Sequence, residues 1–487
     1  MVSANSPQIL KSTDRIIIGH ELVEVGEDLA VAFGEGDRLL GISETKEILH
    51  LRREDIDLVS GCVTRSLTAF DKLRAVSEES IRSFFARFTA LLSDRDVMER
   101  VYSANAIDIG DAKLRGRATT RLELTESMRL QMIDSLGIWE NQIGTREITL
   151  ERIEHEDWSV ESVSAPLGVI GFVFEGRPNV FADATGVLRS GNTCVLRIGG
   201  DALRTASAIM ECAIAPALRD SGLPGDAIQL INSKSRAAGW ALFSDARIAL
   251  AIARGSGTAV AQLGAVARQA GIPVSLHGTG GAWFVAGARA DVQCFEEAVR
   301  NSLDRKVCNT LNVVCIPRSR THDLIPAFER GLVAAATAHG TVGIAHYVGD
   351  RLPIECRLNG DLDARLIDES QLPTEWEWDA VPECSVVVTE DIFHSVSLCN
   401  RYSPQFIVSV ISSDKSEHEF VWKAVNAPFV GNGMSRWVDG QFALLRPELG
   451  LSNWNYGRLL GRSGILSGDS VFTVRLRATM QGSSLHR

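Results

Sequence analysis

The segment from Arg305 to Thr310, RKVCNT, places a cysteine shortly after two cations, with one valine between, and directly before two polar residues. A thiol reacts as its thiolate, and neighbouring cations lower the pKa of a thiol. Cys194 and Cys315 instead lie within apolar runs, where a cysteine behaves as a small buried hydrophobe. Cys308 is therefore the candidate nucleophile among nine cysteines, for attack on a carbonyl carbon. The segment alone leaves open that Cys308 is structural too.

A second segment, EGRPNV from Glu175 to Val180, follows a predicted apolar strand. Ligands of parallel α/β sheets gather at this end of the strands. Arg177 can bind an anion through its planar guanidinium, and Asn179 offers an amide donor for a developing oxyanion. The same residues also suit a turn followed by a helix start, so both interpretations stay open.

Two further strand ends carry glycine. LRIGG sets Arg197 before Gly199 and Gly200, so a backbone can approach a nucleotide with a cation nearby. RGSGT offers helix-start N–H groups that can hold a phosphate. Neither segment fits the G-x-G-x-x-G fingerprint, but three such strand ends on one sheet favour a nucleotide site. The cofactor candidates are Arg197, Gly199, Gly200, Arg254, Gly255, Ser256 and Gly257.

The elements that must position these segments alternate between apolar strands and helical patterns. Strands apolar on both faces and separated by helices predict βαβ units around a parallel sheet. Helical spacing also covers residues 78–111 and 123–138, and the first carries an apolar face. The expected strands are 167–174, 193–198, 227–231, 248–252, 272–276, 311–316, 383–388 and 406–411. The expected helices between them are 180–190, 202–221, 259–270, 292–303 and 322–339, and residues 426–468 are expected to be ordered loops.

Composition narrows the class of protein. The 487 residues suffice for two to four domains, and 45% hydrophobic with 23% charged content is ordinary for a globular chain. The net charge of -11 argues against a general nucleic-acid binder. We expect no membrane span, no export signal and reduced thiols, hence a cytoplasmic location, and no metal.

These segments together resemble the glutamate-5-semialdehyde dehydrogenase (gamma-glutamyl phosphate reductase) family of the aldehyde dehydrogenase superfamily. APLGVIGFVFEGRPNV at 165–180 is close to that family's most recognisable motif, and SGNTCVLR at 190–197 continues it. VCNT at 307–310 matches its nucleophile motif, and NGMSR at 432–436 resembles its C-terminal substrate loop. The resemblance covers residues 70–480.

The resemblance implies an α/β fold with a Rossmann-type cofactor domain, an α/β catalytic domain and an oligomerisation arm. We expect residues 1–65 to be an N-terminal extension, 66–288 the NAD(P)-binding domain and 289–435 the catalytic domain with Cys308. Residues 436–487 would hold the substrate loop and the oligomerisation segment.

The implied reaction is reduction of an acyl phosphate, as in proline biosynthesis. The Cys308 thiolate would displace phosphate to form a thioester, and NADPH would reduce it to an aldehyde. Asn179 and the Cys308 N–H would stabilise the oxyanion. Arg197 favours NADP(H), whereas Asp201 keeps NAD(H) open. The residues expected to bind substrate, unless they serve surface ion pairs, are Arg177, Arg305, Lys306, Asn309 and Arg436. A kinase supplying the acyl phosphate and a homodimer or homotetramer are the expected partners.

The sequence also departs from the family pattern. Residues 1–65 exceed the usual length, the loop before Cys308 is shorter, and Asn312 stands where Glu is usual. His277 and Trp283 lie where Gly or Glu, and then His, are common. An extra residue precedes Gly199, and the loop after Ser452 is longer. These differences cluster where the acyl group of the substrate would bind. The identity of the acyl group therefore stays open, and a substrate from secondary metabolism is one possibility.

Three other functions stay open. The first is reduction of an acyl-CoA or a carrier thioester through the same intermediate. The second is a catalytically silent homologue that binds a nucleotide or a partner. The third is an oxidising aldehyde dehydrogenase, which needs a general base, for which His277 is a weak candidate.

Overall fold

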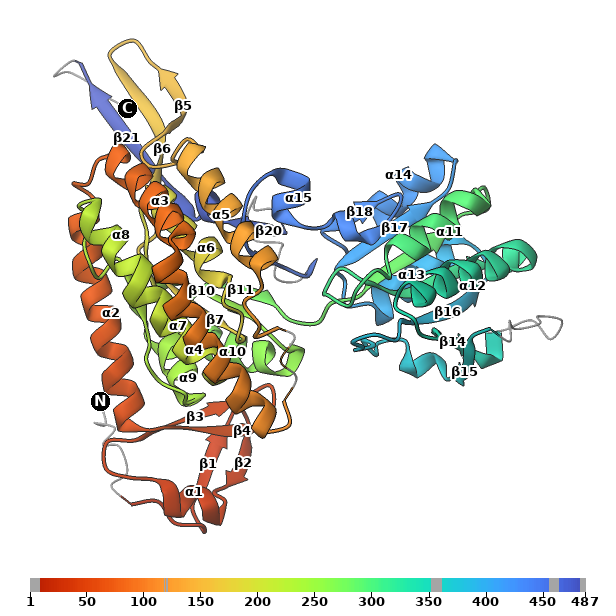
Figure 1. Ribbon diagram of the computed structural model, residues 1–487, viewed down its shortest axis with the longest axis horizontal. Helices are drawn as coiled ribbons and strands as arrows, with labels where there is room; N and C mark the ends of the chain where they lie inside the picture. The colour runs from red at the N-terminus through yellow and green to blue at the C-terminus, as the bar shows by residue number, and fades with distance from the viewer. Residues whose placement is uncertain (1–8, 118, 120, 352–360, 455–463, 482–487) are drawn as a thin grey trace. The chain divides into compact units, whose positions relative to one another are not determined.

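The computed structural model describes residues 9–117, 119, 121–351, 361–454 and 464–481, which form two compact units (Figure 1). Unit 1 spans residues 1–278, 445–450 and 466–487, and unit 2 spans 279–444 and 451–465. The sequence placed this boundary after residue 288. The structure places it after Gly278, because β12 (Ala282–Ala286) is paired into the sheet of unit 2.

The core of unit 1 is a five-stranded parallel sheet in the order β11-β10-β7-β8-β9. Two of its central strands, β7 and β8, are buried along their whole length, as a sheet covered on both faces requires. The parallel sheet predicted from the sequence is thereby confirmed. The strands are β7 (Val169–Phe174), β8 (Thr193–Ile198), β9 (Ile228–Leu230), β10 (Ile248–Arg254) and β11 (Val274–His277).

Helices pack around this sheet. The predicted apolar face of residues 78–91 is confirmed, since Ile81, Phe84, Phe85 and Phe88 are fully buried in a cluster shared with β7 and β8. The pattern over 78–111 is two helices, because Asp94 ends the first and its carboxylate caps Val97 N–H of the second. The helices are α2 (Arg53–Leu73), α3 (Glu78–Ser93), α4 (Arg95–Leu114), α5 (Glu126–Asn141), α6 (Val180–Ala184), α7 (Leu203–Ile209), α8 (Ala215–Asp220), α9 (Ala237–Ser244) and α10 (Gly257–Gln269).

Residues 9–65 are part of unit 1 and not a separate domain, and α2 runs straight through the expected boundary at residue 65. Two hairpins precede α2, and a short helix lies between them. The second hairpin is bound to α10 by Gln262 to Glu47 at 2.8 Å and Arg268 to Glu44 at 2.7 Å. The elements are β1 (Arg15–Ile18), β2 (Glu21–Glu24), α1 (Glu27–Ala32), β3 (Arg38–Ile42) and β4 (Glu47–Leu51).

Unit 2 is built on a seven-stranded parallel sheet in the order β15-β14-β16-β13-β12-β17-β18. Besides β12, its strands are β13 (Leu311–Pro317), β14 (Ile344–Val348), β15 (Asp363–Ile367), β16 (Glu383–Thr389), β17 (Ile407–Ile411) and β18 (Phe429–Gly431). Its helices are α11 (Val292–Asn301), α12 (Thr321–Ala338), α13 (Ile392–Tyr402), α14 (Lys415–Ala424) and α15 (Gly440–Leu444). The described part of residues 426–468, expected to be ordered loops, thus contains β18 and α15 and two further strands, β19 (Glu448–Leu451) and β20 (Ile465–Ser467).

A third, antiparallel sheet in the order β21-β6-β5 belongs to unit 1. No strand pattern predicted this sheet, because β5 is exposed at every residue and β21 at nearly every one. The strands are β5 (Thr149–Glu154), β6 (Trp158–Pro166) and β21 (Phe472–Met480), and the shorter β19 (Glu448–Leu451) and β20 (Ile465–Ser467) precede β21 in the chain. Among the described residues, no helix is long and apolar enough to cross a membrane.

Candidate functional site

In unit 1, the glycine-bearing segments meet at one edge of the sheet. Arg254 at the end of β10 pairs with Phe174 of β7 and with His277 of β11. Backbone bonds continue beyond the strands, from Gly199 N–H to Phe174 O at 3.0 Å and from Gly255 N–H to His277 O at 3.2 Å. The structure therefore brings together the three segments that the sequence selected for a nucleotide.

The segment after β10 leads into the N-terminus of α10, where a carboxylate already lies. Glu175 Oε1 accepts Ser256 N–H at 2.5 Å, and a Cβ on Gly255 would lie 2.9 Å from Glu175 Cγ. A helix N-terminus favours negative charge because its first N–H groups are unpaired. This end of α10 therefore holds the chain's own Glu175 carboxylate, and its binding of a phosphate stays a prediction.

The segment after β8 needs glycine for steric reasons. A Cβ on Gly199 would lie 2.9 Å from the backbone N of Gly176, and one on Gly200 would lie 3.2 Å from Lys234 Cβ. Because backbone atoms cannot move away cheaply, the first glycine is required for the packing of the two segments. A role of both glycines in cofactor binding stays a prediction.

Arg197 and Asp201, at this edge of the sheet, differ in burial and in the groups they contact. Arg197 is only 9% exposed, and its guanidinium donates to Ser235 O at 3.0 Å. Burial lowers the pKa of Arg197, and the nearby Arg236 adds to this. Asp201 forms ion pairs with Arg115, at 2.9 Å, and with Arg117. The more exposed cations beside Asp201 are thus Arg115 and Arg117, which the sequence reasoning missed because they lie far from Asp201 in the chain.

Arg254 is held by two carboxylates of unit 1. Its guanidinium lies 2.6 Å from Glu448 and 3.4 Å from Asp183. Next along the edge, desolvation lowers the pKa of His277 well below its usual value, and the charges of Arg254 and Arg177 add to this. A role of His277 as a general base stays a prediction.

Asn179 precedes α6 and is half-buried. Its Oδ1 is buried and accepts no hydrogen bond from the described residues. A buried amide oxygen without a donor is rare in folded chains. Asn179 and the half-buried Arg177 thus lie at the same strand end of unit 1, and their roles toward a substrate stay predictions.

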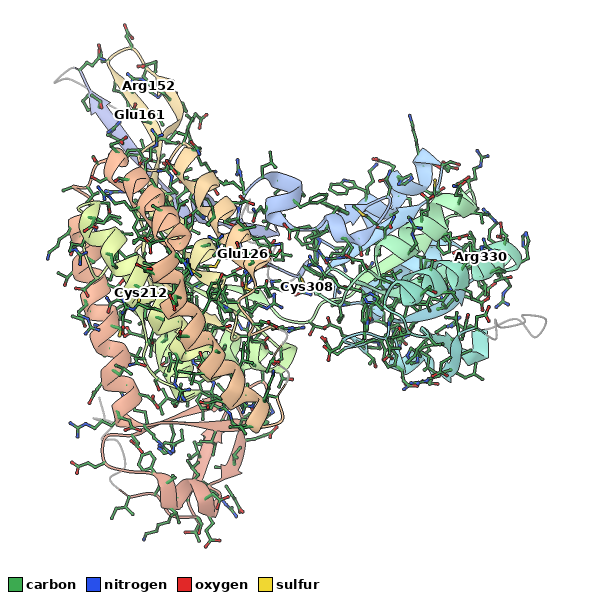
Figure 2. All side chains as sticks on the ribbon, in the orientation of Figure 1. Glu126, Arg152, Glu161, Cys212, Cys308 and Arg330 are labelled. Carbon is green, nitrogen blue, oxygen red and sulfur yellow. The ribbon has the colours of Figure 1, made fainter. Side chains whose placement is uncertain are left out.

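In unit 2, Cys308 lies in the loop between α11 and β13 (Figure 2). It is half-buried and packs against an apolar cluster that includes Ala282 and Phe406. Burial raises the pKa of other cysteines, such as Cys194 and Cys384, which suits their structural role. Cys308 differs from these two in being partly exposed.

The turn that carries Cys308 is fixed by its neighbours. Thr310 Oγ1 accepts Val307 N–H at 2.9 Å and donates to Arg305 O at 2.7 Å. Asn309 is buried, and its Nδ2 donates to Val438 O at 2.7 Å. Asn309, expected to bind substrate, therefore connects the turn by a hydrogen bond to the segment after residue 434.

The Cys308 backbone also lies against the start of β12. Gly281 N–H donates to Cys308 O at 2.8 Å, and a Cβ on Gly280 would lie 2.5 Å from that oxygen. Glu375 Oε2 accepts Gly280 N–H at 2.8 Å, and its Oε1 accepts Lys306 Nζ at 2.7 Å. Sequence reasoning missed Glu375, and no local signal could have shown it.

The predicted substrate-binding cations of unit 2 lie in different surroundings. The Lys306 side chain is 5% exposed and paired with Glu375, and Arg436 donates to Asp304 at 2.7 Å. Arg305 is exposed. Of the three, Arg305 is thus the one that the structure leaves in contact with solvent. No group of three or more metal-ligating side chains was found within the described ranges.

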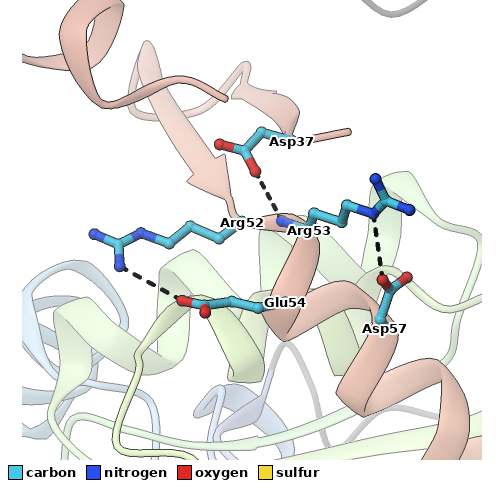
Figure 3. Close-up of a pocket in the computed structure, with 5 residues that line it drawn as sticks. All are labelled: Asp37, Arg52, Arg53, Glu54 and Asp57. Atoms are coloured by element: carbon cyan, nitrogen blue, oxygen red, sulfur yellow. Dashed lines mark hydrogen bonds and ion pairs between the residues drawn. The ribbon is translucent and has the colours of Figure 1, made fainter. Parts of the chain in front are cut away.

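A separate surface hollow of about 390 Å³ lies where the N-terminal hairpins meet α2 (Figure 3). Its charges pair among themselves, Arg52 with Glu54 at 3.6 Å and Arg53 with Asp57 at 3.5 Å. Asp37 accepts the backbone N–H of Arg53 at 2.8 Å. The charged side chains of the hollow therefore have partners within the hairpin and the start of α2.

Comparison with known proteins agrees with this architecture. The aldehyde dehydrogenase family matches residues 43–343, more than half of the chain. The chain therefore belongs to the aldehyde dehydrogenase family and is an NAD(P)-dependent oxidoreductase. The expected fold class is thereby confirmed.

Within that family, its relatives include gamma-glutamyl phosphate reductases. The one from Methylobacterium sp. (strain 4-46) is 29% identical over 78% of this chain and 86% of its own length. The one from Methylobacterium nodulans is 30% identical over 70% of this chain and 74% of its own. The resemblance read from the motifs is thus confirmed.

Two solved structures share the fold. The gamma-glutamyl phosphate reductase of Thermotoga maritima has a TM-score of 0.75 at 22% identity, over 88% of this chain and all of its own. An acetylating aldehyde dehydrogenase from Geobacillus thermoglucosidasius has a TM-score of 0.62 at 12% identity, over 89% of this chain and 98% of its own. At these identities the two structures establish the fold alone.

Proposed function

We propose that this chain reduces an acyl phosphate, gamma-glutamyl phosphate or a related compound, to an aldehyde through a thioester on Cys308. The observation that carries the proposal is the fixed, partly exposed turn that presents Cys308 shortly after Arg305 and Lys306, with only Val307 between. The names of the relatives, gamma-glutamyl phosphate reductases, supply the acyl phosphate as substrate class.

In the proposed reaction the Cys308 sulfur attacks the acyl carbon, a C–S bond forms, and the C–O bond to phosphate breaks. When bound, the reduced nicotinamide supplies the hydride. The hemithioacetal oxyanion then collapses, the C–S bond breaks and the thiolate is regenerated with release of the aldehyde. Asn179 and the Cys308 N–H would stabilise the oxyanion, each worth roughly 3–4 kcal/mol. Arg305, Arg177 and Arg436 are the proposed groups for substrate phosphate or carboxylate.

The support in unit 1 for a dinucleotide is that the three glycine-bearing segments meet at one edge of its parallel sheet. We propose NADP(H) over NAD(H). The carboxylate at the position that would bind a ribose 2′-hydroxyl, Asp201, is already paired with Arg115 and Arg117. Their guanidinium groups are about half exposed and would bind a 2′-phosphate, while buried Arg197 supports the loop.

Calorimetric titration with NADP⁺ and NAD⁺ tests this cofactor choice. Arg115→Gln and Arg117→Gln should each weaken NADP⁺ binding about 10-fold or more, since a hydrogen bond to a charged group is worth roughly 1.5–3 kcal/mol. NAD⁺ binding should not change. Arg219→Gln, an exposed arginine on α8 paired with Asp220, is the matched control. Equal weakening of both cofactors would refute the proposal.

The reaction itself is tested in reverse. Glutamate semialdehyde and a panel of other aldehydes are offered with NADP⁺ and phosphate, and NADPH absorbance is followed. Phosphate-dependent NADPH formation that Cys308→Ser abolishes would support the proposal. Formation with CoA in place of phosphate would favour a thioester reductase instead. No reaction with either, together with no selective alkylation of Cys308 by iodoacetamide, would favour a silent homologue.

Three further proposals concern the setting. An acyl phosphate hydrolyses readily, so an ATP-dependent kinase is the proposed supplier, and the cytoplasm is the proposed location. The sheet β21-β6-β5 exposes Val474 and Leu476 on an edge strand, which supports assembly into homodimers or homotetramers. Size-exclusion chromatography with light scattering tests this, and a monomer at micromolar concentration would refute it.

A further inference from the structure

We propose that the Glu375 carboxylate positions Cys308 by holding Gly280 on one side of the nucleophile turn and Lys306 on the other. This inference rests on the role proposed for Cys308 above. Glu375 is not a neighbour of the turn in sequence, and it lies in the segment between β15 and β16.

The contacts of Glu375 span the turn. One carboxylate oxygen accepts Gly280 N–H at 2.8 Å, and the other accepts Lys306 Nζ at 2.7 Å. Gly280 lies so close to Cys308 that a Cβ there would be 2.6 Å from Cys308 Cα. A shift of the carboxylate would therefore move the Gly280 backbone, which lies against Cys308, and would displace the Lys306 ammonium group.

Glu375 can do this because its own segment is fixed. Buried Asn312, in β13, donates from Nδ2 to Thr374 O at 2.9 Å and accepts Trp376 N–H at 3.0 Å. The Trp376 ring stacks on His346 with centroids 3.8 Å apart and planes 6° from parallel. Asn312, which stands where the family usually has Glu, thus fixes the backbone on both sides of Glu375.

The charge of Glu375 matters as well as its shape. The Lys306 side chain is 5% exposed and that of Glu375 is 19% exposed. Loss of one partner of such a pair leaves a buried charge uncompensated. The charged side chains around the turn are those of Arg305, Lys306, Glu375, Glu377, and Arg436 with its partner Asp304.

Glu375→Gln tests the inference in the full-length chain, because the amide keeps the shape and one acceptor but loses the charge. In the reverse assay, kcat should fall about 10- to 100-fold with KM of the aldehyde within about threefold. The pH midpoint of Cys308 alkylation, followed by mass spectrometry, should move down by roughly half to one unit, since one negative charge is removed. Lys306→Met should move the midpoint up, and the double variant should restore it.

Glu329→Gln is the matched control, because Glu329 is a buried carboxylate of unit 2 that accepts the Tyr347 hydroxyl at 2.7 Å. It should leave kcat and the midpoint unchanged. Wild-type kcat in Glu375→Gln, or a loss of kcat with an unmoved midpoint, would overturn the inference. If Glu375→Gln does not fold, the double variant must show the kcat loss. A wild-type Cys308 that reacts no faster than the buried cysteines would refute the thioester mechanism, and this inference with it.

Discussion

At Gly280, the addition of a single methyl group should lower catalytic turnover strongly while the chain still folds. A Cβ there would lie 2.5 Å from Cys308 O and 2.6 Å from Cys308 Cα. Both are backbone atoms, so no side chain can rotate away. Ordinary contact needs about 3.4 Å or more between such atoms, so Gly280→Ala must push the two backbones apart by roughly 1 Å.

A displacement of that size changes where the sulfur lies. A misplacement of about 1 Å at a reacting group lowers turnover on the order of 100-fold, equal to about 2.7 kcal/mol of barrier. Overpacking of this kind destabilises the fold by about 1–3 kcal/mol, which leaves most of the chain folded at 20 °C. We therefore expect a folded protein with kcat reduced about 100-fold.

The assay is NADPH formation from the active aldehyde, NADP⁺ and phosphate at 20 °C, with the folded fraction measured by circular dichroism. Gly349→Ala is the control in the same unit, because its Cβ would lie 3.6 Å from Leu366 Cβ, an ordinary contact. It should retain wild-type kcat. A kcat of Gly280→Ala within threefold of wild type would refute the reasoning about the turn.

Two other substitutions test unit 1. Asn105 is buried, donates to Leu122 O at 2.8 Å and accepts Leu124 N–H at 3.0 Å. Asn105→Ala should therefore lower the free energy of unfolding, measured by urea titration, by about 2–4 kcal/mol. A loss under about 0.5 kcal/mol would contradict this. The pKa of His277 is lowered in the folded chain, so the unfolded chain binds the extra proton below about pH 6.5. The free energy of unfolding should therefore fall as pH is lowered from 7 toward 5, by at most about 1.4 kcal/mol per pH unit from this residue. His277→Gln should make that slope shallower, and an equal slope in urea titrations at pH 7 and 5.5 would count against it.

The local patterns were sufficient for the elements that carry the site. The strands β7 and β8 and the helix α12 lie within a few residues of their predicted ranges. Apolar runs and helical spacing are repeated over many residues, so a single exception does not hide them. The break at Asp94 was missed, because the apolar face continues on both sides of a residue that caps the next helix.

Strands without a buried face were not predictable in this way. β5 and β21 expose nearly all their side chains, so neither alternates between polar and apolar residues. Pairing with β6 defines them, and β6 lies 306 or more residues before β21 in the chain. The expected domain boundary after residue 288 differs from the observed one for a related reason. The sheet to which β12 belongs is decided by its partner strands β13 and β17.

The sequence by itself determined the parallel sheets, the glycine-bearing strand ends and the choice of Cys308, because each depends on residue type and on spacing within a short segment. Only the tertiary structure decided which charges surround these residues. Glu375 meets Lys306, and Asp201 meets Arg115, across many intervening residues. Such contacts form only when the fold brings distant segments of the chain together. An ion pair between residues far apart in sequence leaves no local pattern that could predict it.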